Sequence, residues 1–236
     1  MMEGREPIEP SEGLGRRVIF TFWTGVEPLS DQRRAALARM PEVTECDVVL
    51  VTAADLPRWV MPEAPLHPAY PFLSAVHRAD YLRSYFMQHY GGGYSDVKPA
   101  RVSWQSAFTH LERCPECWVV GYREVSPDAV AHVADAALYQ ELRRQYASLP
   151  GNGAYVCRPG SPLTTAWVTR VHEVLDQKVD QLRAYPAPHA RASRQEDARY
   201  ALGWTEICGD IFHPLCLEHL EHVATSLTPP DFSNYQ

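Results

Sequence analysis

The sequence predicts an α/β fold, because patterns of buried strands and amphipathic helices alternate along it. Residues 18–23 (VIFTFW) and 46–52 (CDVVLVT) are continuous runs of apolar and β-branched residues, which are typical of buried strands. Residues 30–40 between them have helical composition, with Ser30 as the N-cap and Pro41 as the stop. This strand–helix–strand order favours parallel pairing of the two strands.

Chain length and local composition indicate one domain. The 236 residues are enough for a single α/β domain with a substantial core, and few for two. We place this domain at residues 16–226. Residues 1–15 are polar and contain prolines and glycines, which predicts a flexible tail, and residues 227–236 form a second tail at the C-terminus.

The overall composition argues against several classes of protein. A formal net charge of −7 argues against nucleic acid as a partner, because surfaces that bind nucleic acid are basic. We find no uninterrupted apolar run long enough to span a bilayer and no apolar signal segment at the start, so we expect no transmembrane segment and a cytoplasmic location. The six cysteines are scattered, which fits reduced thiols.

The most informative stretch is residues 74–98, SAVHRADYLRSYFMQHYGGGYSDVK. Apolar residues recur in it at steps of three and four, which predicts an amphipathic helix with Ser74 as its N-cap. Glycines at 91–93 end that helix, because glycine adopts the left-handed cap geometry without a Cβ penalty. A short strand at 94–97 then places Asp96 where the sheet meets a loop, a common position for ligand contacts in α/β folds.

Asp80 and Arg83 lie three residues apart on the predicted helix and are therefore neighbours on its surface. The pattern A-D-Y-L-R, followed by G-G-G-Y-S-D-V-K, resembles the core motif of glycosyltransferase family 32, and the 16-residue step from Asp80 to Asp96 agrees with that family. The family includes capsular polysaccharide transferases, yeast-type mannosyltransferases and the catalytic domains of large glucosylating toxins. The resemblance implies a GT-A-like (Rossmann-like, nucleotide-sugar-binding) fold, with a mixed central sheet and helices on both faces.

The same resemblance implies an activity. Such enzymes transfer a hexose from a nucleotide-sugar donor, here a UDP- or GDP-hexose, to a hydroxyl of a saccharide or small-molecule acceptor, with retention, as in polysaccharide biosynthesis. Asp80 and Arg83 would hold the nucleotide and the sugar. Asp96 is the leading catalytic candidate, and Asp210 and His213 are candidate bases near the departing phosphate. The full set of donor-binding residues that the resemblance implies is Trp23, Asp80, Arg83, Tyr94, Asp96, Lys98, Asn152 and Trp204.

The sequence departs from the family at the metal-binding D-x-D pair, because Lys98 replaces the second acid. A pair of carboxylates can hold a divalent metal against the donor diphosphate, whereas Asp96 alone is a poor site for Mn²⁺ or Mg²⁺. A fixed cation is another way to stabilise the departing phosphate, so a metal-independent enzyme is an alternative in which Lys98 meets the phosphate. On residue type alone, a solvated lysine at a strand end is the favoured explanation of Lys98, and only its position in the motif makes the functional interpretation equally good.

Plainer interpretations of the other candidates also stay open. Trp23 is equally a core tryptophan at the end of a strand. Asn152 lies between two glycines, and turn chemistry alone explains an asparagine there. An Asp80–Arg83 pair is common on helix surfaces and contributes only a few tenths of a kcal/mol.

Two other classes of function compete with a transferase. The first is a catalytically degenerate protein that binds nucleotide sugars or carbohydrate without turnover, an alternative that Lys98 keeps open. The second is a zinc-binding module, since zinc sites use cysteine and histidine at short spacings. Its candidate ligands are Cys114, Cys117, Cys208, His213, Cys216, His219 and His222.

The remaining elements follow from local patterns. Residues 118–122 and 154–157 predict strands, and Gly151–Gly153 predicts the turn before the second of them. Ser161-Pro162 is a strong start signal for a helix to about residue 183. Further helices are predicted at 129–147 and, from a capping box at Ser193–Glu196, up to Gly203.

Overall fold

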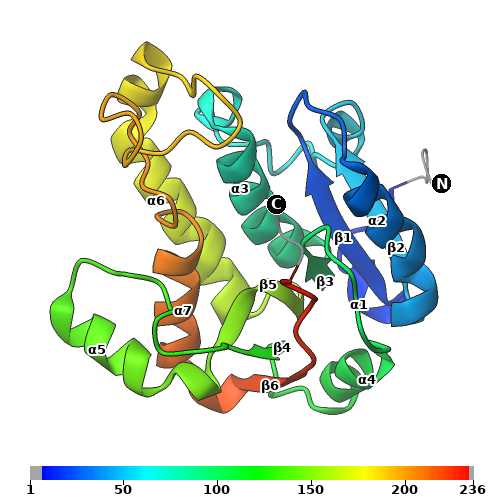
Figure 1. Ribbon diagram of the computed structural model, residues 1–236. Coiled ribbons are helices and arrows are strands. Elements are labelled where there is room, and N and C mark those ends of the chain that lie inside the picture. Colours follow the sequence, from blue (N-terminus) through cyan, green and yellow to red (C-terminus); the bar gives the residue numbers. More distant parts are fainter. Residues whose placement is uncertain (1–6, 234–236) are drawn as a thin grey trace.

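The computed structural model describes residues 7–233, and within them six strands form one mixed sheet in the order β2-β1-β3-β5-β4-β6 (Figure 1). Strands β2, β1 and β3 are parallel, β5 is antiparallel to both of its neighbours, and β6 is parallel to β4. The strands are β1 (Val18–Trp23), β2 (Asp47–Thr52), β3 (Gly92–Ser95), β4 (Val119–Arg123), β5 (Pro150–Cys157) and β6 (Val223–Leu227).

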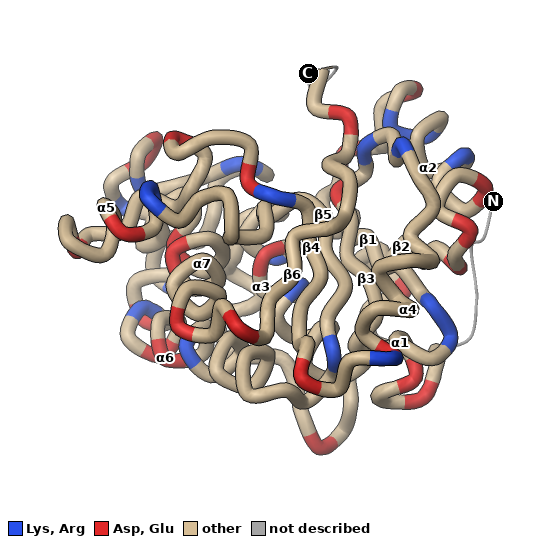
Figure 2. The backbone as a smooth tube through the Cα atoms, turned by 90° about the horizontal axis from the view of Figure 1, so that it is seen from below, with Lys and Arg blue, Asp and Glu red and all other residues tan. Residues whose placement is uncertain are grey.

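Helices cover both faces of this sheet. Figure 2 shows α3, α6 and α7 on one side of the strands and α1, α2 and α4 on the other. The helices are α1 (Glu12–Gly15), α2 (Asp31–Thr44), α3 (Ala75–His89), α4 (Gln105–Arg113), α5 (Ala136–Arg144), α6 (Pro162–Ala184) and α7 (Gly209–Glu218), with short 3-10 helices at Leu56–Arg58, Tyr70–Phe72, Tyr146–Ser148 and Leu220–His222. The predicted fold class, an α/β protein with a mixed central sheet and helices on both faces, is confirmed, and the arrangement is consistent with a GT-A-like fold.

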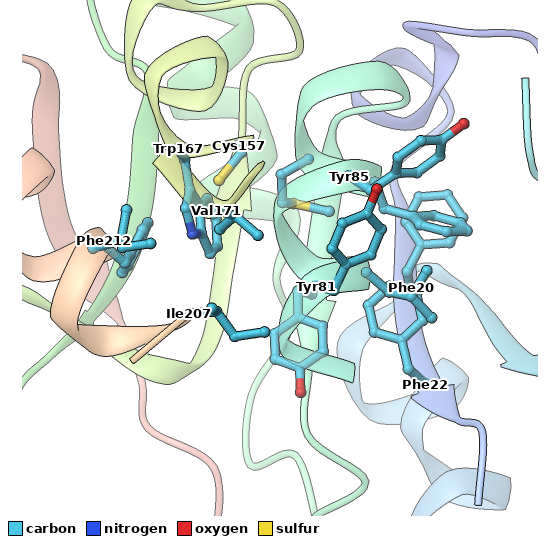
Figure 3. Packing of buried hydrophobic residues seen from close by; sticks show 14 of the residues in the cluster. Phe20, Phe22, Tyr81, Tyr85, Cys157, Trp167, Val171, Ile207 and Phe212 are labelled. Carbon is cyan, nitrogen blue, oxygen red and sulfur yellow. The ribbon is translucent and has the colours of Figure 1, made fainter. Parts of the chain in front are cut away.

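The two faces of the sheet have separate hydrophobic cores, because successive side chains of a strand point in opposite directions. On β1, Phe20 and Phe22 belong to the core beneath α3, α6 and α7, and Ile19 belongs to the core beneath α2 and α4. The larger core is rich in aromatic rings, among them Phe20, Tyr81 and Trp167 (Figure 3). The centroid of the Phe20 ring lies 5.0 Å from that of Phe86 on α3. Strand β1 is therefore buried on both faces, as its continuous apolar sequence predicts.

The central segment folds largely as predicted. The Ser74 hydroxyl accepts a hydrogen bond from the backbone N–H of His77 (3.2 Å), so Ser74 caps α3. Gly91 and Gly92 follow the helix with φ of 66° and 84°, the left-handed conformation expected of them. The strand, however, is Gly92–Ser95 rather than 94–97, so Asp96 lies just beyond it.

Several predicted boundaries are wrong, each because tertiary packing outweighs a local signal. Helix α2 continues past Pro41 to Thr44, since Met40 and Thr44 are both fully buried. Gly151–Gly153 lies inside β5 rather than in a turn. Its glycines admit the ring of Tyr122, since a Cβ on Gly151 would lie 2.2 Å from that ring.

Two predicted helices are shortened or absent. The helix expected at 129–147 is only α5, because Asp135 caps it by accepting from the N–H groups of Ala137 and Leu138. Residues 193–203 contain no helix: the Ser193 carbonyl accepts from the N–H of both Glu196 and Asp197 (3.0 Å each), which forms a turn. This segment belongs to the connection between α6 and α7 that runs toward the start of α3.

Both ends of the described chain pack against the domain. Leu14 is buried, and the N–H of Gly13 donates to the Tyr90 carbonyl (2.9 Å), so part of the predicted N-terminal tail belongs to the fold. Strand β6 extends to Leu227, one residue past the predicted boundary, and the N–H of Asp231 donates to the Pro99 carbonyl (3.0 Å). The remainder of the two predicted tails, residues 1–6 and 234–236, lies outside the described residues.

Candidate functional site

A cavity of about 510 Å³ opens where β1 and β3 end, between α3 and the connection from α6 to α7. The carboxyl ends of parallel strands are the usual place for a ligand in open α/β sheets. Of the eight predicted donor-binding residues, the seven that line this cavity are Trp23, Asp80, Arg83, Tyr94, Asp96, Asn152 and Trp204. The eighth, Lys98, lies behind Asp96.

The floor of the cavity is a chain of alternating charges. The guanidinium Nη2 of Arg83 lies 3.4 Å from Asp80 Oδ1 and 3.4 Å from Asp96 Oδ1, so one arginine bridges both predicted acids. The phenol of Tyr94 donates to the same Oδ1 of Asp96 (2.6 Å). Asp80 and Arg83 from the helix and Asp96 from the end of the strand therefore meet in one polar cluster, as the motif predicts.

Lys98 is part of this cluster from the far side of Asp96. Its Nζ lies 2.9 Å from Asp96 Oδ2 and 4.1 Å from the centroid of the Phe232 ring, and the residue is only 7% exposed. The N–H of Lys98 donates to the Asp96 carbonyl (2.7 Å), which marks a tight turn rather than a continuing strand. Lys98 lines an adjoining cavity of about 390 Å³ instead. Lys98 is thus a buried ion-pair partner of Asp96, and the alternative of a solvated lysine is wrong.

The two carboxylates of the floor are driven to opposite protonation behaviour. Burial raises the pKa of Asp80, and the nearby Arg83 only partly opposes that rise. Burial would also raise the pKa of Asp96, but Arg83, Lys98 and the Tyr94 hydroxyl outweigh it and the pKa of Asp96 is lowered. Two acids whose pKa values diverge suit two different roles, and Asp96 is the stronger acid of the two.

Three further contacts fix the orientation of Arg83, and the one from Cys208 involves a residue that the sequence did not indicate as donor-binding. Its Nη1 donates to the Asn152 carbonyl and to the Cys208 thiol (3.2 Å each). Its guanidinium carbon lies 4.5 Å from the centroid of the Tyr94 ring. Burial raises the pKa of the Cys208 thiol, so it acts here as a neutral polar group rather than a nucleophile.

Asp210 and His213 are not among the residues that line the cavity. Asp210 accepts a hydrogen bond from the Thr205 hydroxyl (2.7 Å) at the start of α7. His213 is fully buried; its Nδ1 accepts from the N–H of Ala131 (2.9 Å), and its Nε2 lies 3.2 Å from Asn152 Nδ2. The structure therefore places His213 behind Asn152, one layer away from the donor cavity.

Because His213 is buried, we expect the free energy of unfolding to fall at acid pH. Burial lowers its pKa to about 4, whereas an unfolded histidine takes up a proton near pH 6.5. Between pH 6.5 and pH 4, the unfolded chain therefore takes up a proton on this histidine and the folded chain does not. As a result, His213 lowers the free energy of unfolding by roughly 2–3 kcal/mol as the pH falls from 7 to 4.5. We expect His213→Gln, which keeps an acceptor for Ala131, to remove most of this acid-dependent loss.

Urea unfolding at pH 7 and pH 4.5 measures this effect for the wild type and the variant. His110→Gln, at an exposed position of α4, is the matched control and should keep the wild-type pH dependence. An acid-dependent loss in His213→Gln as large as in the wild type would contradict the expectation.

The mouth of the cavity carries a tryptophan on each of two walls. The indole N–H of Trp23 donates to the Glu27 carbonyl (2.7 Å), and the guanidinium carbon of Arg33 lies 4.8 Å from the Trp23 ring centroid. Trp204, 39% exposed on the connection from α6 to α7, has Arg191 over its ring at 5.5 Å. Trp23 is therefore a cavity-wall residue with a partly accessible ring, rather than a core tryptophan.

The residues present do not fit a divalent metal. Both oxygens of Asp96 already have hydrogen-bond or ion-pair partners in Lys98, Arg83 and Tyr94, and the neighbouring side chain that would complete a D-x-D pair is a cation. Within residues 7–233, no three or more histidine, cysteine, aspartate or glutamate residues are grouped so that they could hold a metal ion. The cysteines and histidines of the zinc hypothesis accordingly do not form a site in this part of the chain.

Comparisons with known proteins find no sequence match and a distant structural likeness. No family model matches the sequence, and no curated protein sequence matches it. A solved structure described as "PaToxG Glycosyltransferase" is similar over 90% of this chain and 70% of that chain, with 10% sequence identity and a TM-score of 0.42. Membership of family 32 therefore stays a prediction.

Two general properties complete the description. No helix in the described range is both long and apolar enough to cross a membrane. Acidic and basic positions are intermixed around the backbone rather than separated onto two faces (Figure 2).

Proposed function

We propose that this protein is a glycosyltransferase that moves a hexose from a nucleoside-diphosphate sugar to a hydroxyl of a saccharide or small-molecule acceptor. One observation carries the proposal: Asp80, Arg83 and Asp96, which are selected by the family-32 resemblance, meet on the floor of a single cavity. That cavity has a volume of about 510 Å³, within the range of small-ligand sites, and a tryptophan at its mouth.

The geometry supports a separate role for each part of the cavity. The exposed side of Trp23 offers a stacking surface for the nucleobase. The sugar then lies on the floor, where the carboxylates of Asp80 and Asp96 accept from its hydroxyls and Arg83 donates to them. Because Tyr94 and Asn152 hold Arg83 in place, little ordering of the protein is needed when the sugar binds.

The proposed reaction is one substitution at the anomeric carbon. The bond from that carbon to the distal phosphate oxygen breaks, a bond to the acceptor oxygen forms, and the nucleoside diphosphate leaves with the bonding electron pair. The acceptor proton passes to the departing phosphate. Retention of configuration is part of the proposal through the family resemblance alone. We assign no base to Asp210 or His213, since neither lines the cavity.

We further propose that the reaction needs no divalent metal, since Lys98 and Arg83 already compensate the charge of Asp96. Transfer and slow donor hydrolysis should therefore persist in EDTA, with rates within about twofold of those in Mn²⁺. A panel of UDP- and GDP-hexoses, assayed for nucleotide release with EDTA, Mg²⁺ or Mn²⁺, tests both claims together. Release only with added metal would contradict metal independence, and no release with any donor would contradict the transferase.

A donor-binding protein without turnover is the second candidate, and the replacement of the D-x-D acid by Lys98 favours it. Such a protein would show a thermal shift with one nucleotide sugar and no nucleotide release, even with a broad panel of acceptors. The same panel therefore separates the two candidates, because binding and release are measured on the same samples.

A further inference from the structure

The charges on the cavity floor compensate one another. Asp80 and Asp96 supply two negative charges, and Arg83 and Lys98 supply two positive charges at distances of 2.9–3.4 Å from them. Lys98 is buried against Asp96 and Phe232 and faces the adjoining cavity. The floor therefore has no excess positive charge for a diphosphate, which brings two negative charges into the site.

A different cation lies at the mouth. Arg191 lines the cavity, and its guanidinium carbon lies 5.5 Å from the centroid of the Trp204 ring. Across residues 7–233, no carboxylate forms an ion pair with it, whereas its neighbours Arg194 and Arg199 pair with Glu206 (3.5 Å) and Asp197 (3.0 Å). Arg191 is thus a cavity-lining guanidinium whose charge is not compensated by an acidic side chain in that range.

The segment that carries Arg191 is anchored to α3 on both sides of it. The N–H of Val76 donates to the Ala190 carbonyl (3.1 Å), directly before Arg191. Further along, Tyr200 accepts from the N–H of Ser74 (3.1 Å), and His77 Nε2 lies 3.0 Å from the Gly203 carbonyl. A cation on an anchored wall loses less conformational entropy when it binds an anion than one on a free loop.

We infer that Arg191 binds the diphosphate of the donor, and that arginine rather than metal supplies the positive charge there. The inference rests on the proposed function, since it assumes a nucleoside-diphosphate ligand. The planar guanidinium donates two parallel hydrogen bonds to phosphate oxygens, a geometry that suits a fixed anion site. Arg191 lines the same cavity as Trp23 and the floor residues, so a diphosphate that joins a base on Trp23 to a sugar on the floor shares that cavity with its guanidinium.

Binding measurements with and without the phosphates test this assignment. UDP and GDP are the probes, uridine and guanosine are the matched uncharged ligands, and EDTA is present throughout so that metal makes no contribution. We expect Arg191→Gln to weaken binding of the preferred nucleoside diphosphate by about 10–100-fold, the range for a lost hydrogen bond to a charged group. Binding of the nucleoside should change less than twofold, and Arg191→Lys should fall between the wild type and Arg191→Gln.

Arg194→Gln is the matched control. It removes the same charge three residues further along the chain, from a side chain that already pairs with Glu206. It should bind the nucleoside diphosphate like the wild type. Diphosphate binding by Arg191→Gln within twofold of the wild type overturns the assignment, and so does an equal loss in Arg194→Gln, which would indicate a general charge effect. If the wild type binds neither UDP, GDP nor any nucleotide sugar, the proposed function itself fails.

Discussion

Replacing Asp96 with Asn is expected to reduce hexose transfer by on the order of 10³-fold, the scale of losing a preorganised electrostatic group in a buried site. The substitution removes the one carboxylate that contacts Arg83, Lys98 and the Tyr94 hydroxyl at the same time. It preserves the shape of the side chain and one acceptor oxygen. Initial rates of nucleotide release with the preferred donor and acceptor measure the effect.

The same substitution also lowers stability, so the measurement needs a control for unfolding. Removing one partner of a buried ion pair leaves charge uncompensated and costs roughly 3 kcal/mol. Gly160→Ala is a suitable control, because it strains a left-handed residue with φ of 62° outside the cavity. Wild-type activity in Asp96→Asn, at a temperature where both variants are folded, would remove Asp96 from the mechanism.

Gly92→Ala is expected to lower the free energy of unfolding by about 2–5 kcal/mol. Gly92 has φ of 84°, which costs an alanine about 1–2 kcal/mol. An added Cβ would also lie 2.6 Å from the Val18 carbonyl oxygen and 2.8 Å from that of Gly13, which adds the cost of overpacking against backbone, about 1–3 kcal/mol. Urea unfolding of the purified variant measures the sum.

Substitutions at two other glycines separate the cost of the positive φ from the cost of overpacking. Gly160 has φ of 62°, but a Cβ added there would have no heavy atom within 4 Å, so Gly160→Ala should show only the backbone cost of about 1–2 kcal/mol. Gly15 has neither a positive φ nor a close neighbour, so Gly15→Ala should cost nothing measurable. A variant series in which Gly92→Ala is no less stable than Gly160→Ala would contradict the close approach of Val18 and Gly13.

The parts of the fold that could be predicted are those in which local pattern and tertiary packing agree. Strand β1 occupies the residues that its apolar run indicates, and α3 begins after the serine that caps it. At Pro41 and at Gly151–Gly153 the prediction is wrong, because tertiary packing there opposes the local pattern. Burial of Met40 extends a helix past a proline, and the ring of Tyr122 requires glycine inside a strand. Neither effect can be recognised from the residues next to the affected position in the sequence.

The candidate site divides in the same way. Asp80 and Arg83 are neighbours by helix geometry, and Asp96 follows from the motif, so their convergence could be expected. Arg191 and Cys208 come from the connection between α6 and α7, far along the chain from α3, and only the packing of that connection on α3 brings them in. The burial of Lys98 could not be predicted either, since it depends on Phe232, which lies far away in the sequence.

The position of Phe232 makes the Asp96 ion pair depend on a segment that lies far away in the sequence. The ring of Phe232 covers the ammonium group of Lys98, and its centroid lies 5.8 Å from that of the Tyr122 ring. A deletion or insertion that displaces residues 228–233 would therefore open the Lys98 ammonium group to water and weaken its attraction to Asp96. Kinetic comparisons between variants should keep these residues unaltered.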